Sequence, residues 1–154
     1  MSIYNTPLEE RFGEKLEELR EGKKMTREQL ADQVGLTARH IAALERGERR
    51  PTLNTMEKLL RTQFPDLASK YVRQFALLFL DLQKKCDSAE ISTKALDLRG
   101  MLDALRLIRR GIPAGAALDM GITNKAFDSY EQGLIRDVIA ARIPAKLDAG
   151  KLFA

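Results

Sequence analysis

Apolar side chains recur at spacings of three and four along nearly the whole chain. No stretch alternates polar and apolar residues as a half-buried strand does. The pattern therefore predicts an all-α protein. Its N-terminal part is predicted to contain four helices, over residues 8–19, 26–35, 37–47 and 53–60. Thr26 and Thr37 stand where helix N-caps belong, Gln29 completes a capping box, and Gly35 can take the left-handed conformation that closes a helix.

The helical pattern is interrupted at Phe64-Pro65-Asp66, because the residue before a proline avoids helical backbone. We therefore expect two domains, residues 1–64 and 65–154. The second domain is predicted to contain helices over residues 66–85, 92–111, 113–120 and 123–143, with a loop at 84–90 and a frayed tail after Pro144. Residues 75–82 are apolar nearly all round, so they must be buried either by their own half of the chain or by a second copy.

Composition limits the chemistry. With 44% hydrophobic and 31% charged residues the chain reads as a soluble globular protein, and its net charge of +4 is mildly basic. One cysteine and one histidine exclude a Cys/His zinc cage within one chain, and we expect no cofactor and no metal. Carboxylates such as Asp97 and Asp103 are expected on solvated helix faces, so an enzyme is not predicted.

The N-terminal residues show no signal-peptide pattern, and the most apolar run, Phe75 to Leu80, is far too short for a bilayer. We expect a cytoplasmic protein of bacterial or phage type, without a membrane partner.

The stretch from Met25 to Pro51 has the features that a helix-turn-helix requires. A short helix, a turn at Gly35 and a second short helix are followed by several arginines. The small Ala31 permits close helix approach, and four apolar residues are expected to lock the corner: Val34, Leu36, Ile41 and Leu44. The outward residues of the second helix are then Ala38, Arg39, Ala42, Ala43 and Arg46.

These positions carry a family resemblance over residues 8–62. The matching residues are Phe12-Gly13, Leu16, Leu19-Arg20, Thr26, Gln29-Leu30-Ala31, Val34-Gly35, Thr37, Ile41, Leu44-Glu45-Arg46-Gly47, Arg49 and Pro51-Thr52. They resemble the helix-turn-helix of phage lambda repressor and Cro relatives, the xenobiotic-response-element type. The resemblance implies a small all-helical bundle that binds double-stranded DNA, usually as a dimer on two half-sites.

Carried over by position, the resemblance places four residues nearest the bases: Thr37, Ala38, Arg39 and Ala43. Arg39 is the best direct reader, since a guanidinium can pair bidentately with guanine. Ala38 and Ala43 depart from the polar side chains that relatives often carry there, so modest base specificity is expected.

The resemblance implies phosphate contacts as well. Arg27 should lie near phosphate at the start of its helix, where relatives often have glutamine. His40, Arg46 and Arg49 are expected to contact the DNA backbone, with ordinary solvated side chains as the alternative for His40 and for Arg39. Glu45 has the wrong sign for DNA and is expected to orient a neighbouring arginine or backbone group.

Residues 66–143 show a weaker resemblance to the C-terminal helical lid of MoxR/NirQ-type AAA+ ATPases, carried by Ser92 to Leu96, Arg99 and the Met120 to Asp128 segment. That lid supplies a cation that senses nucleotide phosphates, and Arg99, or less favourably Lys94, would correspond. The chain has no GxxxxGK[ST] loop, so ATP hydrolysis is not supported. Arg99 is instead expected to be a structural or interface residue.

The sequence therefore predicts a sequence-specific, DNA-binding transcriptional regulator. It would act as a homodimer that reads the major groove with helix 37–47, its two recognition helices roughly 34 Å apart. Residues 65–154 would form an assembly or regulatory module, with a self-contained bundle that only packs on the N-terminal domain as the alternative. The alternative is a protein-interaction module, an antitoxin or a AAA+ ATPase accessory subunit, that binds a protein partner through residues 65–154 and uses its helix-turn-helix secondarily.

Overall fold

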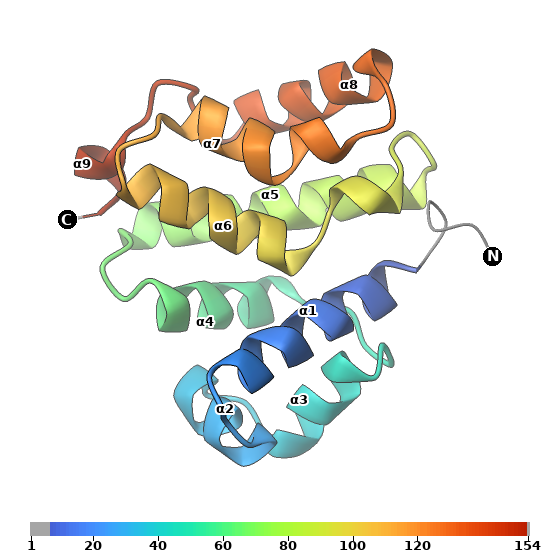
Figure 1. Cartoon of the computed structure of the whole chain (residues 1–154), viewed down its shortest axis with the longest axis vertical. Coiled ribbons are helices and arrows are strands. Elements are labelled where there is room, and N and C mark those ends of the chain that lie inside the picture. The colour runs from blue at the N-terminus through green and yellow to red at the C-terminus, as the bar shows by residue number, and fades with distance from the viewer. Residues whose placement is uncertain (1–6, 154) are drawn as a thin grey trace.

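Four helices form the N-terminal part of the computed structural model, which describes residues 7–153 (Figure 1). They are α1 Leu8–Gly22, α2 Arg27–Val34, α3 Ala38–Glu45 and α4 Leu53–Gln63. Local capping chemistry fixes where three of them begin, because the hydroxyls of Thr26, Thr37 and Thr52 each accept a backbone N–H in the following turn. The predicted capping box between Thr26 and Gln29 is confirmed.

The C-terminal part is helical as well. It contains α5 Ser69–Asp87, α6 Leu98–Arg109, α7 Ala114–Gly121, α8 Ser129–Ala140 and α9 Ala149–Leu152, with short 3₁₀ turns at Thr93–Ala95 and Thr123–Lys125. Between residues 7 and 153 no strand forms, and the one isolated bridge joins Leu67 to Phe153. The predicted all-α class is confirmed. In the same residues, no helix combines the length and the apolar character needed to cross a membrane.

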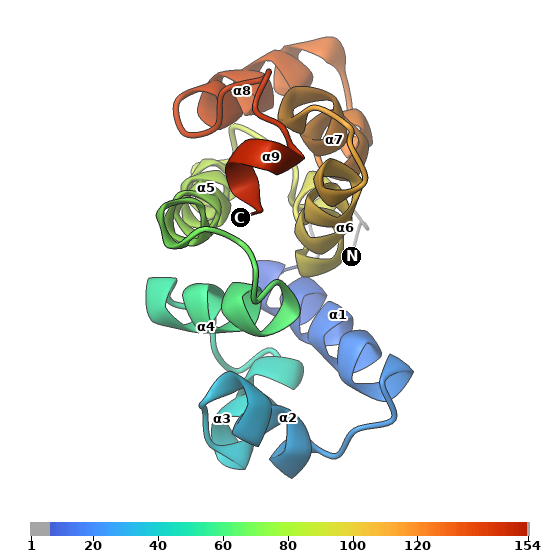
Figure 2. The same ribbon diagram turned by 90° about the vertical axis from the view of Figure 1, so that its left-hand side faces the viewer.

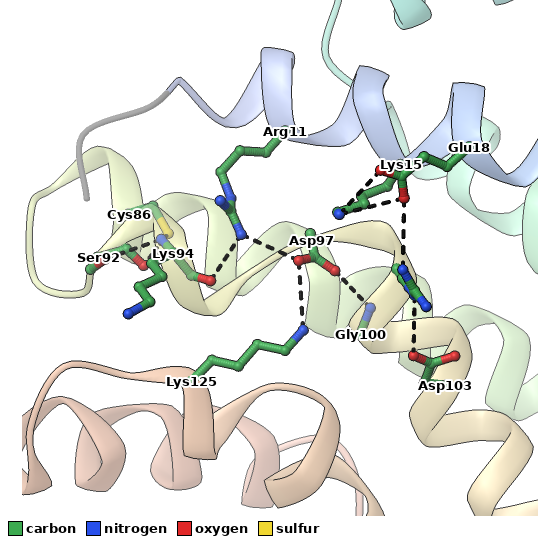
Figure 3. A network of polar contacts seen from close by, with 11 residues as sticks. Arg11, Lys15, Glu18, Cys86, Ser92, Lys94, Asp97, Gly100, Asp103 and Lys125 are labelled. Atoms are coloured by element: carbon green, nitrogen blue, oxygen red, sulfur yellow. Dashed lines mark hydrogen bonds and ion pairs between the residues drawn. The ribbon is translucent and has the colours of Figure 1, made fainter. Parts of the chain in front are cut away.

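The start of α6 differs from the prediction. A helix was expected from Ser92 or Thr93, but only a 3₁₀ turn forms there, and α6 begins after Asp97, whose carboxylate accepts from the Gly100 N–H at 2.7 Å. Asp97 is buried, so its expected place on a solvated face was wrong. The reason is tertiary, because the Asp97 carboxylate also receives two cations from other elements (Figure 3).

The last predicted helix was also placed wrongly at its start. Asp128 caps α8 by accepting a hydrogen bond from the Glu131 N–H at 2.8 Å. Thr123 is instead buried within a 3₁₀ turn. Phe127 therefore precedes the helix, and Phe127 and Tyr130 are 66% and 74% exposed instead of lying on a buried face.

The tail does not fray in the described residues up to 153. The α9 residue Leu152 is buried, and its carbonyl accepts from the Ala68 N–H at 2.8 Å. Phe153 lies against Phe64, with ring centroids 6.1 Å apart. Because the C-terminal tail pairs with the backbone of Leu67 and Ala68, α5 begins at Ser69, three residues later than predicted.

The helices are stacked in pairs along the long axis of the molecule (Figures 1 and 2). The pair α2 and α3 lies at one end, α1 and α4 come next, α5 and α6 follow, and α7 and α8 lie at the other end. The buried face of α5 includes Phe75, Leu78 and Phe79, and α4, α8 and α1 cover it from different sides. The chain itself therefore buries most of the apolar segment 75–82, and a second copy is not needed for this purpose.

Both parts of the chain contribute to one continuous hydrophobic core. The Phe12 ring of α1 meets the Phe79 ring of α5 edge to face, with centroids 5.9 Å apart. Beside this contact, Arg11 of α1 donates to the Asp97 carboxylate at 3.2 Å and to the Lys94 carbonyl at 2.9 Å (Figure 3). Lys125 lies 3.6 Å from the same carboxylate. The helix-turn-helix is thus fastened directly to the C-terminal helices.

Candidate nucleic-acid interface

The corner between α2 and α3 is built from local backbone geometry. Gly35 adopts a left-handed φ of 80°, and its N–H donates to the Ala31 carbonyl at 2.8 Å. Leu36 donates to the same carbonyl at 3.0 Å, which turns the chain sharply after α2. Thr37 then caps α3 by accepting from the His40 N–H at 3.0 Å. The first turn of α3 is therefore presented at a defined angle to α2.

Apolar packing holds this corner in place. Val34, Ile41 and Leu44 are buried, and Leu36 packs half-buried against them, as the sequence predicted. Helix α4 adds two polar ties: Lys58 donates to the Gly35 carbonyl at 2.9 Å, and Thr62 donates to the Gln33 carbonyl at 3.2 Å. The orientation of α3 is thus fixed from both sides.

Glu45 orients two arginines from inside the domain. The Glu45 side chain is fully buried. Its carboxylate accepts hydrogen bonds from Arg20 at 2.7 and 3.0 Å and from Arg27 Nε at 3.0 Å. The bond to Glu45 raises the pKa of Arg20. The expectation that Glu45 orients a neighbouring arginine is confirmed, whereas the part of Arg20 in this arrangement was missed.

Arg27 is consequently held in one direction. The bond to Glu45 uses its Nε, and the side chain remains 36% exposed at the N-terminal end of α2. Ala38, at the start of α3, is half-buried and packs against the core.

The remaining predicted residues meet at one surface hollow of about 390 Å³ along α3, which we call the α3 hollow. Its lining residues are Thr37, Arg39, His40, Ala42, Ala43, Arg46, Glu48 and Arg49. Six of the eight predicted site residues lie there, and Arg27 and Ala38 do not. Ala42 and Glu48 were not among the predicted residues. The outward position of Ala42 in the helical period was the signal for it, and no pattern pointed to Glu48.

Charge in the α3 hollow is unbalanced. Within the described chain, Arg39, Arg46 and Arg49 form no ion pair, whereas most other arginines of the protein bind a carboxylate. Burial, followed by the charges of Arg49 and Lys58, lowers the pKa of His40. With three arginines against the one carboxylate of Glu48, the hollow is therefore a positively charged surface, and such a surface attracts phosphate.

Comparisons with known proteins support a helix-turn-helix in this part of the chain. Residues 16–62, from the middle of α1 to the end of α4, match the family model of the helix-turn-helix. This segment is similar to the helix-turn-helix of the lambda repressor and Cro type. No curated protein and no solved structure matches the chain. The resemblance of residues 66–143 to an ATPase lid gains no support from these comparisons.

Proposed function

We propose that the protein is a sequence-specific transcriptional regulator that places α3 in the major groove of DNA. The observation that carries the proposal is the cluster of Arg39, Arg46 and Arg49 in the α3 hollow without carboxylate partners in the described residues. Arginines that already bind carboxylates cost free energy to recruit to DNA, because an ion pair must first be broken. These three are available to phosphates and base edges.

Within this proposal, the α3 residues divide by their position. Thr37, Ala38, Arg39 and Ala43, from the cap and first two turns of α3, face the bases, and Arg39 reads guanine. His40, Arg46 and Arg49 contact phosphates and set the register. Arg27 adds a phosphate contact through its terminal amino groups while Glu45 holds its Nε.

We further propose a homodimer on two half-sites. One recognition helix contacts only a few base pairs, and two copies about 34 Å apart would read successive turns of the same groove face. Because the α5 apolar face is covered within the chain, a dimer must use another surface.

The test is a selection from a randomised duplex pool at two salt concentrations, followed by binding titrations of variants. We expect a palindromic site to be enriched and affinity to fall steeply with salt. Arg39→Ala should lose roughly tenfold or more in affinity and relax one base position. Arg49→Ala should weaken all sequences alike and lower the salt slope by about 1.

Arg110→Ala is the matched control. Arg110 also lacks an ion pair in the described residues, but it lies on the loop after α6, outside the α3 hollow. Its removal should leave binding unchanged. No binding at low salt, or an equal loss in Arg39→Ala and Arg110→Ala, would overturn the proposal and favour the protein-interaction alternative.

A further inference from the structure

A second cationic site lies where the helix-turn-helix meets the C-terminal helices. Helices α1 and α6 leave a cleft of about 230 Å³ between them, lined by Lys15, Glu18 and Leu19 of α1 and by Arg99, Leu102 and Arg106 of α6. Leu102 is buried and Leu19 packs half-buried on the core, so the cleft has an apolar floor. Its rim is charged. We call this site the α1–α6 cleft.

The cations of the cleft are incompletely neutralised. Lys15, Arg99 and Arg106 line it against one carboxylate, that of Glu18. The ion pairs to Glu18 are long, 3.5 Å from Lys15 and 3.8 Å from Arg99. Figure 3 shows Lys15 and Glu18 on α1 and Asp103 on α6.

Asp103 does not line the cleft, but among the described residues it is the other carboxylate that pairs with the two arginines. It lies 2.8 Å from Arg106 and 3.8 Å from Arg99. Arg106 therefore has one close partner, and Arg99 has two distant ones. The three longer pairs, Lys15–Glu18, Arg99–Glu18 and Arg99–Asp103, each include a solvent-exposed carboxylate, so they contribute little free energy and are readily exchanged for a ligand.

We propose that the α1–α6 cleft binds a small organic anion with a doubly charged head group, a phosphate monoester of a compact apolar alcohol. The two guanidinium groups of Arg99 and Arg106, with Lys15 beside them, would hold the phosphate oxygens in charge-assisted hydrogen bonds. The apolar part would lie on Leu19 and Leu102. The site is separate from the α3 hollow, and the inference does not depend on DNA binding.

Such a ligand would touch both halves of the molecule at once. Its contacts on α1 belong to the helix that packs against α3, and its contacts on α6 belong to the helix that packs against α7. Binding would therefore stabilise the seam between α1 and α6.

The experiment uses the uniformly ¹⁵N-labelled full chain, titrated with phenyl phosphate in the absence of DNA. We expect saturable shifts of the amides of Leu19, Leu102 and Arg106 and of the Arg99 and Arg106 side-chain N–H groups. Inorganic phosphate should bind more weakly because it lacks the ring, and phenol should not bind because it lacks the charge. Shifts centred on residues 37–49, or scattered over all basic side chains, would overturn the proposal.

Variants sharpen the test. Arg99→Gln and Arg106→Gln should each weaken phenyl phosphate roughly tenfold, in line with the loss of one charge-assisted bond. Glu18→Gln should tighten binding, because it removes the carboxylate that repels the ligand. Misfolding cannot produce this gain. Glu28→Gln on α2 changes the net charge equally and lies outside the cleft, so it should leave the affinity unchanged. Equal effects of Glu18→Gln and Glu28→Gln would also overturn the proposal.

Discussion

His40 is the residue through which pH should act on DNA binding. Burial and the neighbouring charges of Arg49 and Lys58 lower its pKa, so the imidazole is neutral near pH 7 in the free protein. A phosphate placed against it would raise that pKa and favour the cationic form. Binding would then take up a proton. We expect affinity for DNA to rise as pH falls from about 8 to about 6, and this slope to be flatter in His40→Gln.

The folded protein responds to pH with the opposite sign. Folding lowers the pKa of His40, so the unfolded chain binds the proton more readily than the folded protein. Protonation of the unfolded chain therefore lowers the free energy of unfolding as pH falls below about 6.5. Binding titrations must therefore stay where urea curves show a folded protein. Parallel pH profiles of the wild-type protein and His40→Gln would remove His40 from the interface.

At the level of single residues, the sequence predicts those features that depend on near neighbours. The capping residues contact only near neighbours in the sequence, and each has its predicted role: Thr26 with Gln29, Gly35 and Thr37. Arg20 was missed as a partner of Glu45 because 25 residues separate them. The spacing that brings them together exists only after α1 has packed on α3.

Packing of α1 on α3 depends on one glycine. A Cβ atom at Gly13 would lie 2.4 Å from the Leu44 carbonyl oxygen and 2.5 Å from that of Glu45. Both obstacles are backbone, so they can give way only if the helices separate. We expect Gly13→Ala to lower the free energy of unfolding by about 2 kcal/mol or more, measured by urea denaturation.

Gly22→Ala provides the matched control on the same helix. Nothing lies within 4 Å of a Cβ at Gly22, and alanine has the higher helix propensity. This variant should be neutral or more stable by about 0.5 kcal/mol. Equal destabilisation of the two variants would show that the loss arises from glycine replacement in α1 as such, and not from the contact with α3.

Among the helices, prediction worked where caps and periodicity are local and failed where distant contacts decide. The four N-terminal helices form where the pattern placed them. The α6 start moved to Asp97 because Arg11, 86 residues earlier, binds that carboxylate. The tail became ordered because Leu152 and Phe153 pack back beside Ala68 and Phe64. Neither contact can be predicted from the hydrophobic periodicity of the segment itself.

Across the whole molecule, the boundary at Phe64-Pro65 separates two sets of helices that share one core. The Phe12–Phe79 contact and the bonds of Arg11 to Asp97 and Lys94 cross between them. A buried ion pair is strongly destabilising to break, because removal of one partner leaves the other charge unpaired. The seam should therefore make the two sets unfold together.

Asp97→Asn tests this coupling, because asparagine can still accept from the Gly100 N–H as an N-cap but leaves Arg11 and Lys125 without their anion. We expect a loss of about 3 kcal/mol, with amide hydrogens of α3 and α6 exchanging faster by the same factor. Asp103→Asn, which removes an exposed pair on the same helix, should change stability by less than about 1 kcal/mol. Faster exchange confined to α6 would mean that the helix-turn-helix is stable by itself, and the α1–α6 seam would then not transmit changes from one part of the molecule to the other.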